Sequence, residues 1–339
     1  MAVTPTPTAR TTVTITGHQG NALAELRART ALRAAGLDPR VPLTRASSVT
    51  NEVWLTPTHV VRVNRGRDRR LAREARVAEV LPASVGYPRV HALGGRPGED
   101  WLVLERVPGA PLARVWPRLG RRERQRAIVE VAHRLRALHD TPAPEDLPPV
   151  AGAPQLLEAG TGDATAPLRA ALLDLAHRPH VEPLLVQEAL ELVAASADAL
   201  EPFDSPTLVH GDLTFENVLW HEGEVTAILD VEWSRPSPLD VDLDIILRCC
   251  AHPQLHVAPD LEAVTRPEDY AEVPTWLADA YPRLFSSPRA LERLRLFALA
   301  YEVRSLVADP PRLPVDRLDP LHAYHRFARL VRGESYLDP

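Results

Sequence analysis

The strongest constraint on this chain comes from residues 208–220, where a group of polar side chains interrupts two apolar runs. The stretch reads LVHGDLTFENVLW, and four polar side chains fall within eight residues: His210, Asp212, Glu216 and Asn217. Burying two carboxylates, an imidazole and an amide together is costly unless each group has a partner or a cation. The apolar flanks therefore predict a polar loop, held between short strands, that meets a ligand or a metal ion.

The spacing within this loop favours phosphoryl-transfer chemistry. Asp212 and Asn217 are five positions apart, which places them at opposite ends of a loop and not on one helical face. With His210 they match the pattern H-x-D-x-x-x-x-N, in which the aspartate accepts the proton of the attacking hydroxyl and the asparagine binds Mg²⁺. Each residue alone has a simpler explanation, because such side chains also bond the backbone of tight turns.

A second acidic position supports the metal site. Asp230 lies thirteen residues after Asn217, following the apolar run AIL within a predicted strand over 225–233. A carboxylate and an amide oxygen from two strands joined by a hairpin suit a hard cation such as Mg²⁺. We therefore predict Asp212 as the catalytic residue and Asn217 with Asp230 as the metal ligands.

Composition limits the classes of function. The chain has 339 residues, a net charge of −6 and no lysine, so each of its 39 basic residues is an arginine. No basic patch interleaves with aromatic residues, which argues against nucleic acid as a partner. We find no apolar run of the ~18 residues that a membrane span needs and no secretion signal, and the only cysteines are the neighbours Cys249 and Cys250. We expect no membrane partner and a cytoplasmic location.

The first third of the chain predicts a small lobe of mixed structure. After a Thr/Pro-rich tail at 1–20, which we expect to be flexible, helical periodicity alternates with β-rich runs. Two of these runs flank a Pro-Thr turn and predict a hairpin. The predicted helices are 21–36 and 68–83, and the predicted strands are 41–46, 52–56, 59–64, 87–93 and 100–107. This N-terminal lobe, 21–108, ends where Pro and Gly mark a connection.

Residues 109–339 predict a larger and mainly helical lobe that surrounds the polar loop. Its predicted helices are 122–141, 167–177, 183–200, 239–251, 288–308 and 319–333. The fold class that follows is α+β with two lobes. The small lobe combines an antiparallel sheet with a helix, and the large lobe carries the candidate catalytic residues.

The motifs HGDLTFENVLW and AILDVEWSRPSPLDVDL resemble those of the aminoglycoside phosphotransferase superfamily, which shares its two-lobed fold with protein kinases and choline kinases. The family signature falls on these residues: His210, Gly211, Asp212, Asn217, Asp230, Asp242 and Leu243. The resemblance extends over roughly residues 40–335 and is most specific in the polar loop. Where protein kinases have Asp-Phe-Gly, this chain has Asp-Val-Glu at 230–232. A glycine at the third position is not typical of the antibiotic kinases.

The resemblance implies that ATP, or GTP as an alternative donor, binds with Mg²⁺ between the lobes. A basic residue on the third strand should contact the nucleotide phosphates, and a glutamate of the next helix should hold it. These roles fall on Arg62 and Glu74, with Glu79 as the rival glutamate. Arginine suits the position because it stays charged and binds phosphate with two donors. The alternative is an exposed arginine beside a solvated glutamate.

The family also implies further nucleotide contacts. Residues Ser47, Ser48 and Asn51 would replace the glycine-rich phosphate loop with hydroxyl and amide donors, and the backbone from Glu105 to Val107 would contact the adenine.

Four other polar residues receive supporting roles. His139, near a predicted helix end, and His210 are expected to be structural. Glu216 and Glu232 are expected to contact metal, substrate or solvent.

The predicted acceptor is a small hydroxylated molecule, with an antibiotic preferred: an aminoglycoside or another hydroxylated natural product, including uncharged nucleoside or macrolide types. Six acids and one base lie between 260 and 281, the acids being Asp260, Glu262, Glu268, Asp269, Glu272 and Asp279. Aminoglycoside kinases use carboxylates of this region to bind cationic antibiotics, whereas a solvated acidic surface explains the same composition. The alternatives to an antibiotic kinase are a kinase for a sugar, an amino alcohol or a biosynthetic intermediate, and a non-catalytic nucleotide-binding protein. Both a monomer and a homodimer fit this sequence.

Overall fold

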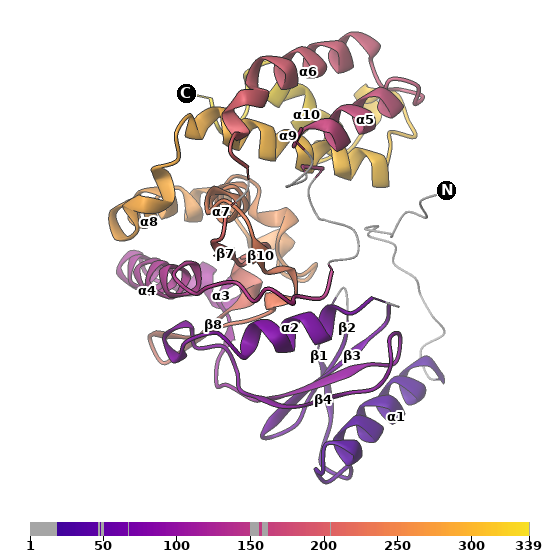
Figure 1. Cartoon of the computed structure of the whole chain (residues 1–339), viewed down its shortest axis with the longest axis vertical. Coiled ribbons are helices and arrows are strands. Elements are labelled where there is room, and N and C mark those ends of the chain that lie inside the picture. Colours follow the sequence, from indigo (N-terminus) through magenta and orange to yellow (C-terminus); the bar gives the residue numbers. More distant parts are fainter. Residues whose placement is uncertain are drawn as a thin grey trace.

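The computed structural model describes residues 19–46, 48, 51–66, 68–149, 156–157, 162–203 and 205–338. Its N-terminal lobe contains a five-stranded antiparallel sheet in the order β1-β2-β3-β5-β4. The strands are β1 (Thr44–Ala46), β2 (Asn51–Leu55), β3 (His59–Asn64), β4 (Val90–Gly94) and β5 (Trp101–Glu105). Figure 1 shows this sheet between α1 (Gln19–Ala34) and α2 (Arg70–Ala78).

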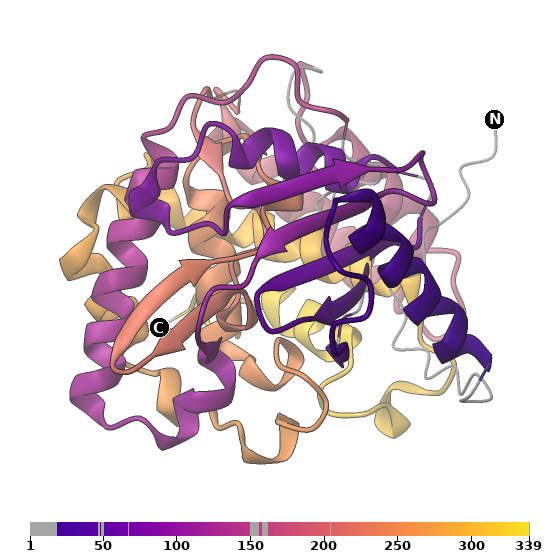
Figure 2. The same ribbon diagram turned by 90° about the horizontal axis from the view of Figure 1, so that it is seen from below.

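The alternation of side chains along β3 places a charged residue on one face of the sheet. Val61 and Val63 are buried against the apolar residues of α1. Figure 2 shows α1 crossing this face of the sheet. Because neighbouring side chains of a strand point to opposite faces, Arg62 points to the other face, where α2 packs. The hairpin of β2 and β3 pairs Val53 with Arg62, and this register sets the position of the arginine relative to α2.

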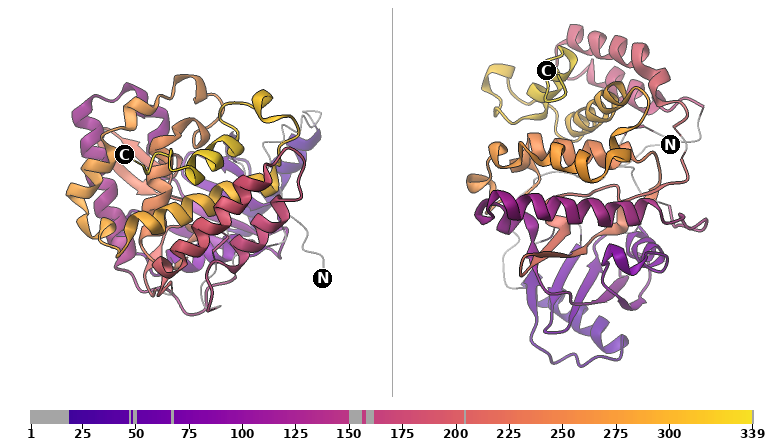
Figure 3. Two further views of the ribbon diagram at one scale, coloured as in Figure 1. Left: turned by 90° about the horizontal axis from the view of Figure 1, so that it is seen from above. Right: turned by 90° about the vertical axis from the view of Figure 1, so that its left-hand side faces the viewer.

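The C-terminal lobe is built in helical layers around a small β structure. In Figure 3, α4 lies next to the sheet-bearing lobe, and α5, α6, α9 and α10 form the opposite end of the molecule. The helices are α3 (Leu112–Val115), α4 (Arg121–His139), α5 (Ala166–Leu175), α6 (Pro183–Ser196), α7 (Asp240–Ala251), α8 (Val273–Ala280), α9 (Ala290–Ala308) and α10 (Ala323–Val331). One large apolar core runs through these layers.

Two small sheets carry the polar loop. Strands β7 (Leu208–Val209) and β10 (Arg235–Pro236) pair, and β6 (Ala110–Pro111) pairs with the hairpin of β8 (Val218–His221) and β9 (Glu224–Ile228). The apolar flanks of the loop are buried, as the sequence predicts. The loop is therefore fixed at both ends by strands, and its residues Asp212, Glu216 and Asn217 line the space between the lobes, whereas His210 is buried.

One predicted strand is wrong in its length. Instead of continuing to residue 233, β9 ends at Ile228, and a short 3₁₀ turn occupies Val231–Trp233. Asp230 between them has a φ of +62°, a left-handed conformation that aspartate adopts more readily than most residues. The apolar run before Asp230 carries no sign of this turn, which redirects the chain at the predicted metal ligand.

Among the described residues, no helix is both long enough and apolar enough to cross a bilayer. The boundary between lobes at residues 108 and 109 stays a prediction. The proposed tail at 1–20 lies outside the described residues except for its last two.

Candidate active site

A cleft of about 730 Å³ separates the two lobes. Arg62 and Glu74 line it from the N-terminal lobe, and Asp212, Asn217 and Asp230 line it from the C-terminal lobe. The residues predicted from two distant parts of the sequence are therefore brought to one cavity.

Hydrogen bonds to buried side chains hold the polar loop in place. His210 is fully buried; its Nε2 bonds the carbonyl of Leu229 at 2.9 Å, and its Nδ1 accepts from the backbone N–H of Asp212 at 3.2 Å. The Asp242 carboxylate accepts from the N–H groups of His210 and Gly211 at 2.7 and 2.8 Å. These contacts agree with the orienting role predicted for His210. They also fix the backbone conformation of the loop at Asp212.

Gly211 fits this loop because a side chain would not. Its φ is +81°, and a Cβ there would lie 2.6 Å from the carbonyl oxygen of Trp233. The loop can approach the 3₁₀ turn after Asp230 only because this position has no side chain.

The two predicted metal ligands are joined through one hairpin. Val218 of β8 pairs with Ile228 of β9, and the Leu229 N–H donates to the Asn217 carbonyl at 2.8 Å. The Asn217 amide nitrogen donates to the Asp212 carbonyl at 2.9 Å, which leaves the amide oxygen for a ligand. Asn217 and Asp230 therefore lie at adjacent ends of a rigid hairpin, beside Asp212.

Arg62 lies among three carboxylates. Its guanidinium donates to Glu74, to Asp230 at 2.9 Å and to Glu232 at 3.0 Å. Suitable oxygen atoms of these three acids lie within 4.8 Å of one another, a spacing that suits a hard divalent cation. The cluster of Glu74, Asp230 and Glu232, called here the carboxylate cluster, can thus hold either the arginine alone or a cation with it.

Other side chains tie the carboxylate cluster to the small lobe. The Tyr87 hydroxyl donates to Glu74 at 2.6 Å, Asn51 donates to Glu232 at 3.0 Å, and Arg70 donates to Glu232 at 3.2 Å. Since Glu232 lies two residues beyond Asp230, its bonds to Asn51 and Arg70 attach the sheet and α2 to the turn that carries Asp230.

Burial and mutual repulsion raise the pKa values of three acids of the site. Burial, followed by the negative charge of Asp230, raises the pKa of Asp212 to about 7, against the opposing effect of Arg248 and Arg304. The same two causes raise the pKa of Glu232 to about 7, and burial raises the pKa of Glu74 despite its bond to Arg62. A pKa near neutrality suits Asp212 as a general base.

The structure separates the candidate nucleotide contacts into different environments. Ser48, Glu105 and Val107 line the cleft, while Ser47 lies outside the described residues. Asn51 is fully buried in β2, and its amide donates to Glu232. Because this side chain is already bonded inside the protein, the structure disfavours the predicted contact between Asn51 and the nucleotide phosphates. The rival Glu79 is exposed and pairs with Arg76, not with Arg62.

Two residues have larger roles than their sequence positions indicate. Glu232, assigned a supporting role, is almost fully buried and binds two arginines. Asp242, noted only as part of a family motif, also bonds His139 at 3.0 Å, which makes His139 structural as expected. Asp240, Asp242 and Asp244 alternate with apolar residues in α7, so this spacing alone did not distinguish Asp242.

The acidic segment 260–281 does not line this cleft. Three of its acids pair with arginines near α3 and α4: Asp260 with Arg114, Asp269 with Arg124 and Glu272 with Arg121. Glu268 and Asp279 are exposed. These contacts favour the interpretation of this segment as a solvated, ion-paired surface.

Solved structures with the same fold include enzymes that act on aminoglycosides. The aminoglycoside phosphotransferase APH(2'')-IIa with gentamicin has a TM-score of 0.61 and 15% identity, covering 91% of this chain and 96% of that chain. The ADP-bound APH(2'')-Ib has a TM-score of 0.58 and 15% identity, covering 87% and 95%. A choline/ethanolamine kinase family protein from Mesorhizobium loti has a TM-score of 0.55 and 20% identity, covering 91% and 93%. At these identities the likeness shows the fold, and the predicted two-lobed kinase-like fold is confirmed.

Sequence comparison gives a more specific result. An aminoglycoside 3'-phosphotransferase of Streptomyces fradiae is 35% identical over 168 residues, which cover 48% of this chain and 57% of that protein. The aligned part therefore spans a little over half of the relative's length. The model of the phosphotransferase enzyme family, APH, matches residues 43–278, and because this match covers more than half of the chain, the chain belongs to that family.

Proposed function

We propose that this protein is an ATP-dependent O-phosphotransferase that moves the γ-phosphoryl group to a hydroxyl of a small molecule. The observation that supports this proposal is the placement of Asp212, Asn217 and Asp230 opposite Arg62 and Glu74 across one cleft. The nucleotide-bound kinases that share the fold support ATP as the donor. Family membership supports the reaction class.

Each residue has a defined task in this reaction. Arg62, oriented by Glu74, binds the nucleotide phosphates, and Asn217 and Asp230 hold Mg²⁺. When bound, Mg²⁺ neutralises charge on the phosphates. Asp212 positions the acceptor hydroxyl and takes its proton as the oxygen bonds the γ-phosphorus and the bond to the leaving ADP oxygen breaks. Such catalysis depends mainly on positioning and charge.

The acceptor of this reaction has two candidate classes. The Streptomyces fradiae relative supports an antibiotic, with resistance or self-protection as the outcome. The position of the acidic segment 260–281, outside the cleft, instead favours a metabolite without several positive charges.

The test is the variant Asp212→Ala with a matched control, Asp279→Ala, which removes an exposed acid of α8. We expect Asp212→Ala to bind Mg-ATP normally in a thermal-shift titration and to lose about 10²–10⁴-fold of acceptor-dependent ADP release. Asp279→Ala should behave as the wild type. The acceptors are gentamicin, streptomycin, hygromycin B and a set of sugars and amino alcohols. Near-full turnover by Asp212→Ala would disprove the catalytic assignment, and Mg-ATP binding without turnover of any acceptor would favour the non-catalytic alternative.

A further inference from the structure

We infer that Arg73 of α2 is a positioning residue of the Mg-ATP site, because it holds the helix that carries Glu74 against the turn that carries Asp230. The inference rests on the proposed function, since it concerns how the two halves of that site are assembled. Arg73 is buried and lies outside the described lining of the cleft. It therefore acts through its neighbours and not on the substrate.

The side chain of Arg73 joins α2 to two segments of the C-terminal lobe. Its Nε donates to the carbonyl of Ser234 at 2.9 Å, and its Nη2 donates to the same carbonyl. Its Nη1 donates to the carbonyl of Pro148. In Figure 1, α2 lies on the side of the small lobe that faces the C-terminal lobe. The guanidinium thus bridges the two lobes through main-chain atoms.

Ser234 connects this contact to the catalytic residues. It is fully buried and directly follows the 3₁₀ turn after Asp230. Its N–H donates to the carbonyl of Val231 at 3.1 Å, and its hydroxyl donates to the carbonyl of His210 at 3.3 Å. The backbone that Arg73 binds is therefore fixed relative to Asp230 on one side and to the catalytic loop on the other.

On the α2 side, the residue after Arg73 is the partner of the proposed phosphate-binding arginine. Glu74 is fully buried and forms an ion pair with Arg62. Arg73 and Glu74 are consecutive residues of one helix, so a displacement of α2 would move Glu74 and its partner together. Both would then shift relative to Asp230, and a misplacement of about 1 Å in an active site can lower the rate ~10²-fold. The contact of α2 with Ser234 thus sets the spacing between the phosphate-binding and metal-binding side chains.

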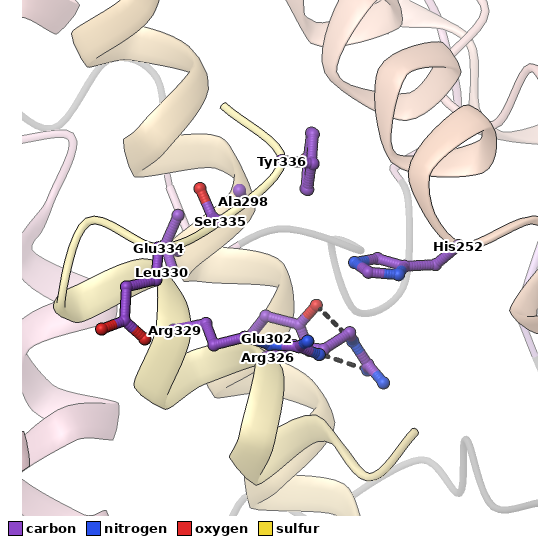
Figure 4. Close-up of a pocket in the computed structure, with 9 residues that line it drawn as sticks. All are labelled: His252, Ala298, Glu302, Arg326, Arg329, Leu330, Glu334, Ser335 and Tyr336. Carbon is purple, nitrogen blue, oxygen red and sulfur yellow. Dashed lines mark hydrogen bonds and ion pairs between the residues drawn. The ribbon is translucent and has the colours of Figure 1, made fainter. Parts of the chain in front are cut away.

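Arg73 differs from the other buried arginines in its partners. Five arginines are buried in the described part of the chain, and four of them form ion pairs with carboxylates: Arg62, Arg248, Arg293 and Arg326. Figure 4 shows one such pair, Arg326 with Glu302. Arg73 has backbone carbonyls as its partners instead, and burial together with the charge of Arg235 lowers its pKa to about 10. Because a buried cation without a counter-charge is unfavourable, stability alone does not explain an arginine at this position.

The competing role for Arg73 is a purely structural one, in which its contacts stabilise the lobe interface without affecting the site. In that role its removal would lower the free energy of unfolding, and the affinities for all parts of the nucleotide would change equally or not at all. As a positioning residue, Arg73 affects the binding of the phosphates and the metal ion and leaves the binding of the base and sugar unchanged.

The experiment compares the binding of Mg-ATP and of adenosine to the full-length protein by calorimetry. Adenosine carries the base and sugar of ATP without phosphates, so its affinity reports on the rest of the nucleotide site. The variants are Arg73→Met, which removes the donors, and Arg73→Lys, which keeps the charge. Arg76→Met is the matched control, because it removes an arginine of the same helix whose ion pairs with Asp146 and Glu79 are exposed. Urea unfolding gives the stability of each variant.

We expect Arg73→Met to weaken Mg-ATP binding by about 10–100-fold, as for the outer partners of metal ligands, and to leave adenosine within about twofold. Arg73→Lys should lose less, because an ammonium group lacks the fork of donors that reaches both Ser234 and Pro148. Arg76→Met should bind both compounds like the wild type. If the effect passes through Glu74, the double variant Arg73→Met with Glu74→Gln should lose no more than the larger single loss.

Three results would overturn the inference: unchanged Mg-ATP affinity in both Arg73 variants, an equal loss for adenosine and Mg-ATP, or fully additive losses in the double variant. If Arg73→Met does not fold, Arg73→Lys decides the question by losing affinity for Mg-ATP alone or not. A selective loss of Mg-ATP affinity in a protein that phosphorylates no acceptor would refute the proposed function and leave the positioning role standing. Transfer to an acceptor together with an equal loss for both compounds would do the reverse.

Discussion

The two ends of the cleft differ in charge. At the nucleotide end, the carboxylate cluster of Glu74, Asp230 and Glu232 shares two arginines, Arg62 and Arg70. At the acceptor end, Arg248 and Arg304 oppose the rise in the pKa of Asp212, and Arg248 forms an ion pair with Asp244 at 2.9 Å. The first end has acid in excess and suits a metal ion, whereas at the second end arginine offsets the negative charge of Asp212. Asp212 lies between them and responds to both.

This difference explains why Asp212 suits the role of a base. The pKa of Asp212 is raised by burial and by the negative charges of Asp230 and Glu232, and it is lowered by Arg248 and Arg304. Mg²⁺ bound at Asp230 would remove the main repulsion that Asp212 experiences. The carboxylate would then ionise more readily when the nucleotide site is loaded, which couples metal binding to the readiness of the base.

The largest effect at the nucleotide end is expected from Asp230→Asn. Loss of this carboxylate should lower Mg²⁺-dependent transfer by at least about 100-fold, because the outer partners of metal ligands alone contribute ~10–100-fold. The measurement is ADP release as a function of Mg²⁺ concentration. Asp260→Asn, which breaks only the exposed pair with Arg114, is the control. An unchanged Mg²⁺ dependence in Asp230→Asn would show that the metal is held elsewhere.

A smaller effect is expected from Glu74→Gln. The substitution removes the charged partner that orients Arg62. The guanidinium should then pair more closely with Asp230 and Glu232 and bind the phosphates less well, so we expect the KM for ATP to rise by about 10–100-fold. Glu79→Gln, one turn further along, should leave KM within about twofold because Glu79 is an exposed partner of Arg76. Equal effects of the two variants would contradict the assignment of Glu74.

The smallest effect is a pH dependence set by Asp212. Because the pKa of this acid is raised to about 7, its base form is lost as the pH falls below that value. We expect kcat/KM for the acceptor, measured without saturating Mg-ATP, to fall about tenfold per pH unit below ~7. With saturating Mg-ATP the acid limb should move to lower pH, since the metal offsets Asp230. A limb that stays in place would indicate that Asp212 does not experience the charge of Asp230.

The sequence predicted the site best where the local hydrophobic pattern and the chemistry of the residues point to the same structure. Apolar flanks around His210 and Asp212 predicted a buried polar loop, and the Pro-Thr turn predicted the hairpin that carries Arg62. The resemblance to the family paired Arg62 with Glu74. All of these depend on residues close together in sequence or on a known motif.

The rest depends on long-range packing. Asn51 and Glu232 are 181 residues apart, and neither position carries a local sign of the other. The left-handed turn at Asp230 lies inside an apolar run that reads as a strand.

The most direct test of this account is a competition among acceptors. Wild-type protein is incubated with Mg-ATP and equal amounts of gentamicin, glucose, glucuronate and glucose 6-phosphate, and mass spectrometry identifies which compound gains a phosphoryl group. The account predicts that at least one of these hydroxylated compounds gains a phosphoryl group and that Asp212→Asn forms no product. No product with the wild-type protein, or the same products from Asp212→Asn, would contradict it.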